Sequence, residues 1–139
     1  MDKKPRWNNE FTDASDDEVI PVVRAGHLFP VARSSVQWAQ AEGDYVRLHI
    51  PGESYLARRP LGYLAKRWAE HGFVCIHRSY LVFFPLVTDV WRGPSGYNVR
   101  LGSGPDSVDI PVSRRHEQEV KHRWIQECHH HGNGTSRTA

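Results

Sequence analysis

Short runs in which apolar and polar residues alternate recur along the chain, a pattern typical of half-buried strands. The clearest run is residues 45–50, in which Val46, Leu48 and Ile50 share one face. Turns that contain Gly or Pro separate many of the runs, which predicts successive antiparallel hairpins. The other runs with strand signals are residues 19–23, 27–32, 35–41, 54–59, 73–84, 87–93, 97–101 and 107–112.

Two details predict how individual strands turn and face. Gly26 follows the first strand signal and suits a tight reversal into the second. Residues 35–41 alternate through Val36, Trp38 and Gln40, which predicts a half-buried strand with these side chains on one face.

The apolar period changes from two to about 3.6 in residues 60–72, which predicts an amphipathic helix. Pro60 suits its first turn, and Gly72 suits a left-handed residue after its last turn. The apolar face of this helix consists of Leu61, Leu64, Ala65 and Trp68. Further along, Ser113 offers an N-cap to a helix over residues 114–128 that has a thin apolar stripe.

Strands outnumber helices, so the predicted fold class is mainly β with α additions. At 139 residues the chain suits one domain rather than two, and the periodic block covers residues 19–126. The acidic segment 1–18 and the His-containing segment 127–139 lack periodicity and are expected to be flexible tails.

No apolar run approaches the roughly 20 residues that span a bilayer, and no hydrophobic segment follows the basic start of the chain. The sequence therefore predicts a cytoplasmic protein without a membrane partner. Two cysteines make no disulfide framework, and we expect a buried thiol at Cys75 and a tail thiol at Cys128.

The sequence contains no enzyme motif, so we assign no catalytic residue. Phosphate-binding glycine loops, HExxH and GxSxG are all absent from it. His77, Ser79 and Asp89 are the residue types of a catalytic triad, but nothing in their spacing supports one.

Thiolate and imidazole groups near the C-terminus are suitable metal ligands, because three histidines follow Cys128 directly. His116 and His122 lie upstream, but their spacing of six turns them to different faces of a helix. Adventitious binding is the favoured interpretation, so we assign no metal site and no cofactor.

Arginine provides fourteen of the eighteen basic residues. A guanidinium suits phosphate or the O6/N7 edge of guanine, although a GC-rich genome would also enrich arginine. Fifteen basic and ten acidic residues follow residue 19, so that part of the chain carries a formal charge of +5.

Several arginines stand where a purely structural role is hard to assign. Arg78 interrupts the apolar run 73–84, although desolvating an unmatched charge is costly. Arg114 and Arg115 open the second predicted helix against its dipole. Such positions favour an anionic partner, and the alternative interpretation of Arg114 and Arg115 is two ordinary solvated side chains.

Three blocks in fitting order resemble the LytTR DNA-binding domain of bacterial transcription regulators. The resemblance covers roughly residues 19–126 and implies an elongated arrangement of small, mostly antiparallel β-sheets with few helices. It also implies loops that enter successive major grooves on one side of a bent duplex. The blocks are "EGDYVRLHI", "YLARRPLGYLAKRWAEHGFVCIHRSYLV" and "YNVRL…DIPVSRRHEQEVK".

The resemblance implies that Asp44, Arg78 and Arg114 face the bases. Arginine can bind guanine through two hydrogen bonds. Asp44 either accepts a hydrogen bond from cytosine or shapes its loop while Glu42, Tyr45 or the backbone makes the contact. The side chains expected at the DNA backbone are Arg58, Arg59, Ser79, Tyr80, Arg115 and His77, with His77 either near a phosphate or holding its loop.

The implied partner is double-stranded DNA with paired direct repeats, bound by two molecules or by a weak homodimer. Such domains commonly follow a receiver domain or a membrane sensor, and nothing of that kind precedes residue 19. We therefore expect either a stand-alone regulator, controlled by its concentration or by a partner protein, or a piece of a longer chain. The alternative function is a protein-interaction or metal-sensing module on the same scaffold.

Overall fold

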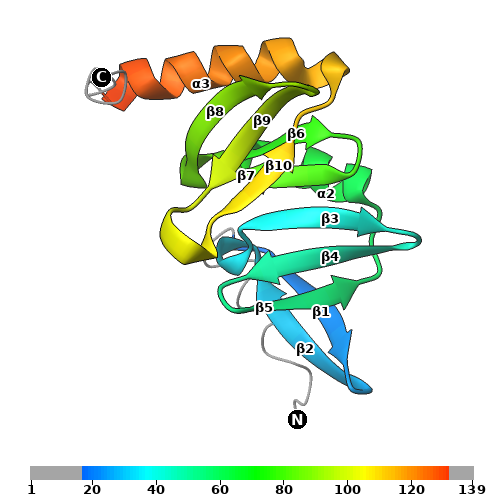
Figure 1. Cartoon of the computed structure of the whole chain (residues 1–139). Coiled ribbons are helices and arrows are strands. Elements are labelled where there is room, and N and C mark those ends of the chain that lie inside the picture. The colour runs from blue at the N-terminus through cyan, green and yellow to red at the C-terminus, as the bar shows by residue number, and fades with distance from the viewer. Residues whose placement is uncertain (1–16, 132–139) are drawn as a thin grey trace. The chain divides into compact units, whose positions relative to one another are not determined.

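The structure, a computed structural model, describes residues 17–131, the last three of them by their backbone only. Most of both expected tails, residues 1–16 and 132–139, lies outside this part. The described chain divides into two compact units, residues 17–74 with 79–83 and residues 75–78 with 84–131. Antiparallel strands outnumber α-helices in both units, which confirms the predicted fold class (Figure 1).

The first unit is built on a sheet with the strand order β2-β1-β5-β4-β3-β7-β6. The last strand, β6 (Phe73–His77), begins in this unit and ends in the second. The other elements of the first unit are β1 (Val19–Arg24), β2 (His27–Ala32), β3 (Trp38–Glu42), β4 (Tyr45–Ile50), β5 (Glu53–Ala57), α2 (Leu61–Trp68) and β7 (Tyr80–Phe83).

The β1–β2 hairpin turns at Ala25 and Gly26, whose φ values of 53° and 79° confirm the predicted tight reversal. In a two-residue hairpin the hydrogen-bonded pairs alternate from the closing pair outward. Pro21 and Pro30 face each other at a pair that lacks hydrogen bonds, so neither ring removes a bond from the hairpin.

Helix α2 forms as its apolar spacing predicts. Leu61, Leu64 and Trp68 are buried, and the indole of Trp68 packs against the ring of Phe73 at 5.0 Å between centroids. A 3-10 turn follows the helix, and Gly72 ends it with φ of 91°, the left-handed conformation expected there.

The predicted facing of residues 35–41 holds for Trp38 and Gln40, which share a face of β3, but it is wrong for Val36. A 3-10 turn occupies Arg33–Ser35, and the strand begins only at Trp38. Ala39 is the fully buried position of β3, whereas Trp38 lies on the opposite face and stacks on His49 with ring centroids 3.7 Å apart. The turn breaks the alternation, so Val36 is buried without sharing the face of the strand.

Two carboxylates of the segment expected to be a tail are bound to the first unit. Asp17 accepts hydrogen bonds from the backbone N–H and the hydroxyl of Ser34, at 2.9 and 2.6 Å. Glu18 accepts from the Arg67 guanidinium and from the Trp68 indole N–H, both at 2.9 Å. These contacts attach the start of β1 to the rest of the unit.

The second unit contains a three-stranded sheet of order β10-β9-β8, crossed by a C-terminal helix (Figure 1). Val99, Ile110 and the helix residue Val120 are fully buried in its core. The elements are β8 (Val87–Gly93), β9 (Gly96–Leu101), β10 (Val108–Pro111) and α3 (Glu117–His131).

Ser113 does not cap the last helix as predicted. It precedes a 3-10 turn, Arg114–His116, and α3 begins only at Glu117. The Ser113 hydroxyl is bound to Nδ1 of His116 at 2.7 Å instead of to a backbone N–H. Arg114 therefore does not oppose a helix dipole, and acidic Glu117 and Glu119 occupy the first turn of α3, where the dipole favours them.

Within residues 17–131, neither α2 nor α3 combines the length and the apolar character that crossing a bilayer would require.

Candidate functional site

The arginines of the described chain differ in how their charge is balanced. Five pair with carboxylates: Arg24 with Glu53, Arg33 with Asp17, Arg47 with Glu42, Arg67 with Glu18 and Arg100 with Asp109. Four others lie against aromatic rings: Arg58, Arg59, Arg92 and Arg123. Among residues 17–131, Arg78, Arg114 and Arg115 are exposed and have neither kind of partner. In the described part of the chain these three guanidinium groups are therefore neither paired with a carboxylate nor held by a ring.

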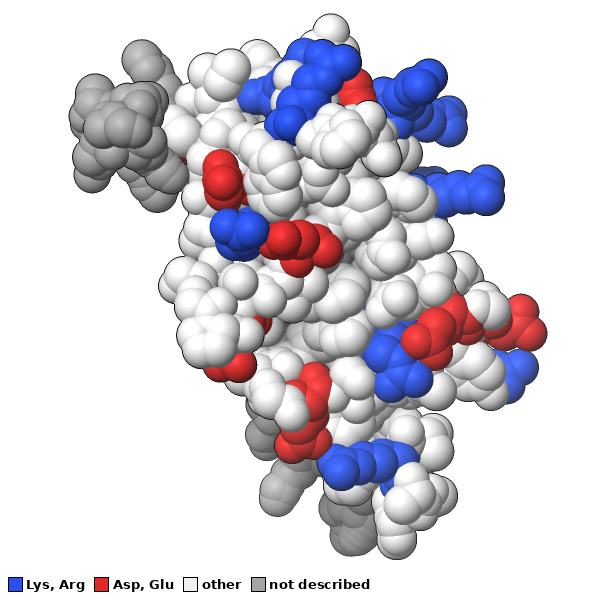
Figure 2. All heavy atoms as spheres, in the orientation of Figure 1, with Lys and Arg blue, Asp and Glu red and all other residues white. Residues whose placement is uncertain are grey.

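These three arginines belong to the second unit. The Ser113 N–H donates to the carbonyl oxygen of Ile76 at 2.9 Å, which ties the segment before α3 to the end of β6. Arg78 follows Ile76 by two residues, and Arg114 follows Ser113 directly. Figure 2 shows basic side chains standing out from the surface where the β6–β7 turn and the start of α3 lie.

The apolar run 73–84 splits around Arg78 as expected. β6 ends at His77 and β7 begins at Tyr80, with the turn between them. Ile76 and Leu81, on either side, are fully buried, while Arg78 is exposed. The buried flanks hold a short tip from which the guanidinium projects.

His77 and His116 lie beside this cluster. Partial burial lowers the pKa of His77, and the positive charges of Arg78 and His116 lower it further. His116 entered the sequence analysis only as a metal ligand, yet it fixes Ser113 through the 2.7 Å hydrogen bond. The Ser-x-x-His spacing was the signal available for this role, because residues i and i+3 meet across one turn of a 3-10 helix.

The remaining predicted base-facing residue, Asp44, lies in the β3–β4 turn of the first unit. Gly43 enables this turn with φ of 61°, and Asp44 is exposed without a partner among the described residues. Glu42 is bound by both arms of the Arg47 guanidinium, at 2.7 and 3.1 Å, which lowers the pKa of its carboxyl. Glu42 is thus occupied within the protein, and Asp44 and Tyr45 are the candidates that face outward.

Tyr45 is 39% exposed and lies under the guanidinium of Arg58, which is 5.4 Å from the ring centroid. A long hydrogen bond of 3.4 Å from Arg58 Nη1 to the Tyr45 hydroxyl joins them. Arg59 lies over the ring of Tyr63 at 5.9 Å. The aromatic rings therefore orient two arginines after β5 without neutralising them.

Ser79 and Tyr80 belong to the first unit, on the other side of the β6–β7 turn from Arg78. The carbonyl oxygen of Ser79 accepts from the Ala41 N–H at 2.9 Å. The ring of Tyr80 lies 6.0 Å from that of Trp38. Both residues are half-buried, so their backbone is fixed while part of each side chain reaches solvent.

No group of three or more His, Cys, Asp or Glu side chains suited to a metal ion occurs in the described part of the chain. The side chains of the histidines after Cys128 lie outside the described residues. Cys75, expected as a buried thiol, is half-buried, and its Sγ donates to the His77 carbonyl oxygen at 3.3 Å. Burial raises the pKa of this thiol.

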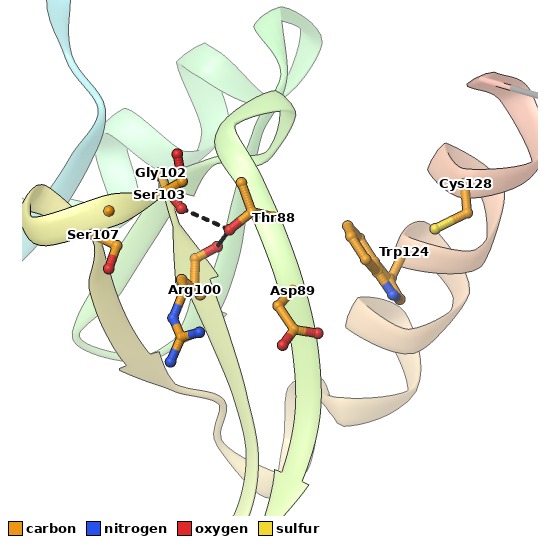
Figure 3. Close-up of a pocket in the computed structure, with 9 residues that line it drawn as sticks. Thr88, Asp89, Arg100, Gly102, Ser103, Ser107, Trp124 and Cys128 are labelled. Carbon is orange, nitrogen blue, oxygen red and sulfur yellow. Dashed lines mark hydrogen bonds between the residues drawn. The ribbon is translucent and has the colours of Figure 1, made fainter. Parts of the chain in front are cut away.

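A groove of about 680 Å³ lies between β8, the β9–β10 connection and α3 in the second unit (Figure 3). Asp89, Ser103, Ser107 and Trp124 are among the residues that line it, and two of its other polar side chains are engaged within the protein. The Thr88 hydroxyl donates to the carbonyl oxygens of Gly102 and Arg100, at 2.7 and 3.3 Å, and the Arg100 guanidinium binds Asp109.

Comparison with known proteins agrees with this geometry. The family model of the LytTr DNA-binding domain matches residues 26–125. The heme-containing CO-sensing transcriptional regulator RcoM 2 of Paraburkholderia xenovorans (strain LB400) is 24% identical over 102 residues. That match covers 73% of this chain and 38% of the relative, so the chain spans well under half of the relative's length.

A solved structure shows the same fold. It is the LytTr DNA-binding domain of a protein described as a methyl-accepting/DNA response regulator from Bacillus cereus. The similarity has a TM-score of 0.64 at 15% sequence identity and covers 74% of this chain and 93% of that one.

Proposed function

The chain belongs to the LytTR DNA-binding domain family, and we propose that it regulates transcription by binding a specific sequence of double-stranded DNA through its loops. The observation that carries this proposal is the cluster of Arg78, Arg114 and Arg115. All three are exposed and lack an ion pair or an aromatic partner within residues 17–131. A guanidinium that no carboxylate balances keeps its full charge and its hydrogen-bond donors for an anionic partner.

Arg78 and Arg114 are the proposed readers of bases in the major groove. Each projects from a short turn, and the Ser113–Ile76 hydrogen bond keeps the two turns together. Bidentate binding of the O6/N7 edge of guanine would give each arginine about 1–3 kcal/mol of discrimination. Arg115, next in the same 3-10 turn, is proposed to bind a phosphate.

The first unit would add one further reading loop and several backbone contacts. Asp44, exposed and unpaired among the described residues, is proposed to accept a hydrogen bond from cytosine N4. Tyr45 would hold Arg58 toward a phosphate, since the ring orients the guanidinium without neutralising it. The other proposed backbone contacts are Arg59, Ser79, Tyr80 and His77.

Two copies are proposed to bind paired direct repeats, and a partner protein is proposed to control them. DNA as the ligand would place the protein in the cytoplasm. Loops that enter successive grooves reach different parts of one site, so each copy would read a whole repeat.

Selection of binding sites from a pool of random duplexes tests the proposal, because the operator is unknown. We expect one sequence to be enriched, and gel retardation should show that it binds at least 1,000-fold more tightly than random DNA. Affinity should fall steeply with salt, as phosphate contacts require. No enrichment, or equal affinity for selected and random duplexes, would rule the proposal out.

A matched pair of double variants connects this result to the cluster. Arg78→Ala with Arg114→Ala removes two unpaired arginines, whereas Arg24→Ala with Arg100→Ala removes two that are ion-paired. Both proteins lose the same formal charge. Only the first should lose the preference for the selected sequence.

A further inference from the structure

The outer face of the β1–β2 hairpin is apolar; Val23, Leu28 and Pro30 on it are exposed, and Val19, Pro21 and Ala32 are half-buried. Val23 and Leu28 are paired in the strand register, and they are 54% and 69% exposed. Side chains of paired residues share a face of the sheet, and the faces alternate along each strand. The residues of this surface, which we call the hairpin face, are Val19, Pro21, Val23, Leu28, Pro30 and Ala32.

The hairpin face is not the side of the hairpin that packs into the core of the first unit. The opposite side carries Ile20, Val22 and Val31, which are 1%, 0% and 6% exposed and belong to the core. A sheet with one buried side normally presents polar residues on the other. All six residues of the hairpin face are apolar, and such contiguous surfaces mark interaction sites in soluble proteins.

The neighbouring strands limit the extent of this surface. Leu56 of β5 is paired with Val23 and continues the apolar area by one residue. The next positions on the same side are polar and already bound to each other, because Arg47 donates to Glu42 at 2.7 Å and to Ser54 at 3.0 Å. The apolar area therefore ends at β5, and it contains no residue that is proposed to contact DNA.

We infer that the hairpin face binds the hairpin face of a second copy of this chain. Elsewhere in the described part of the chain, Arg78, Arg114 and Arg115 are exposed without a carboxylate or ring partner, so copies that met there would bring like charges together. The hairpin face has no charged residue, so two of these faces can meet without bringing like charges into contact. It is also apolar and therefore complementary to itself, as a two-fold contact requires.

The face joins copies through side chains rather than through added strands. β2 is the outermost strand of its sheet. Pro30 lies at a pair without hydrogen bonds, so its nitrogen, which carries no hydrogen, is directed toward the free edge. A missing donor in the middle of a short edge strand disfavours pairing with another strand.

The contact is weak and separate from DNA reading. Six residues and Leu56 are far fewer than the roughly 20–30 residues per side of a stable interface, so a dissociation constant near 0.1–1 mM is expected. The β1 half of the hairpin face precedes residues 26–125, which the family model matches, and the β2 half lies within them. Because direct repeats orient two copies alike, the two-fold contact would join copies on separate sites.

Sedimentation velocity of the full chain without DNA, from micromolar to millimolar concentration, tests the inference. Wild-type protein should sediment faster as concentration rises, and Leu28→Glu should remain monomeric throughout. The control is Ile125→Glu, which makes the same change at a residue of α3 that is 64% exposed, and it should associate like the wild type. Retention of the far-UV circular dichroism spectrum identifies variants that have folded.

Three results would overturn the inference. All proteins could remain monomeric at millimolar concentration, which would leave the face to a different partner. Leu28→Glu could associate as strongly as the wild type. Pro30→Val, which restores the edge N–H, could strengthen association more than tenfold, which would show strand addition instead of face-to-face contact. None of these measurements uses DNA, so they are independent of the proposed function.

Discussion

Glu18 attaches the start of β1 to helix α2, and replacing it tests how the first unit is held together. Its carboxylate accepts the indole N–H of Trp68 at 2.9 Å, and its two oxygens share the Nε–H of Arg67, at 2.9 and 3.1 Å. Trp68 is fully buried, whereas the side chain of Arg67 is 47% exposed. Glu18→Ala therefore removes the acceptor of a buried donor and one partner of a surface ion pair.

The two losses differ in size. A buried N–H left without an acceptor costs about 1–3 kcal/mol. The ion pair is exposed on the Arg67 side and contributes at most about 1 kcal/mol. We therefore expect Glu18→Ala to lower the free energy of unfolding by about 1–4 kcal/mol. Glu18→Gln keeps a carbonyl oxygen for Trp68 and should cost no more than about 1 kcal/mol.

Urea denaturation followed by circular dichroism measures both values. Glu53→Ala is the matched control, because it removes another carboxylate that pairs with an exposed arginine, Arg24. It should change the free energy of unfolding by less than about 1 kcal/mol. If Glu18→Ala were no more harmful than Glu53→Ala, or Glu18→Gln as harmful as Glu18→Ala, the buried indole would not be the cause.

Three further predictions concern other parts of the fold. Gly72→Ala places a side chain at a left-handed residue with φ of 91°, so thermal unfolding should show a loss of stability of about 1–3 kcal/mol. The control is Gly62→Ala in α2, whose added Cβ meets nothing within 4 Å, and it should raise stability by up to about 1 kcal/mol. Burial raises the pKa of Cys75, so its thiol should react with alkylating reagents more slowly in native than in urea-unfolded protein at pH 7.5, as mass spectrometry of labelled peptides would show. Burial lowers the pKa of His49 and His77 below that of histidine in the unfolded chain, so the unfolded state binds more protons. The free energy of unfolding should therefore fall as the pH drops below about 6.5, and constant stability between pH 7 and pH 5.5 would contradict this.

Sequence periodicity predicts those elements in which one face is buried and the other is exposed along the whole element. β4 alternates strictly, and α2 repeats its apolar residues at helical spacing between Pro60 and Gly72. The facing of Val36 could not be predicted in the same way. A 3-10 turn before Trp38 breaks the alternation, and the ring of His49 covers Trp38 across the sheet.

Contacts between distant residues explain the other differences. Glu18 looks like part of an acidic tail until α2, about fifty residues later, places Trp68 beside it. Serine is a residue type that often caps helices, but the 3-10 turn after Ser113 brings the His116 ring to its hydroxyl, which binds that ring instead of a backbone N–H.

The candidate site was partly predictable. The interruption of an apolar run by Arg78 indicated an exposed tip, and the resemblance to a family placed Arg114 in a second loop. The hydrogen bond from the Ser113 N–H to the Ile76 carbonyl oxygen, which joins these loops, involves backbone groups and has no sequence signature. The sequence also could not show which arginines pair with carboxylates, because only the fold brings the two groups together.

The central claim is that Arg78 reads a base while Arg58 holds the DNA backbone. The direct test is the affinity of Arg78→Ala and Arg58→Ala for the selected site and for every single-base-pair variant of it. Arg78→Ala should lose about 1–3 kcal/mol on the selected site and become indifferent to one base pair. Arg58→Ala should weaken binding to all the duplexes by the same factor. If Arg78→Ala weakened every duplex equally and kept the full preference at each position, Arg78 would not be a reader.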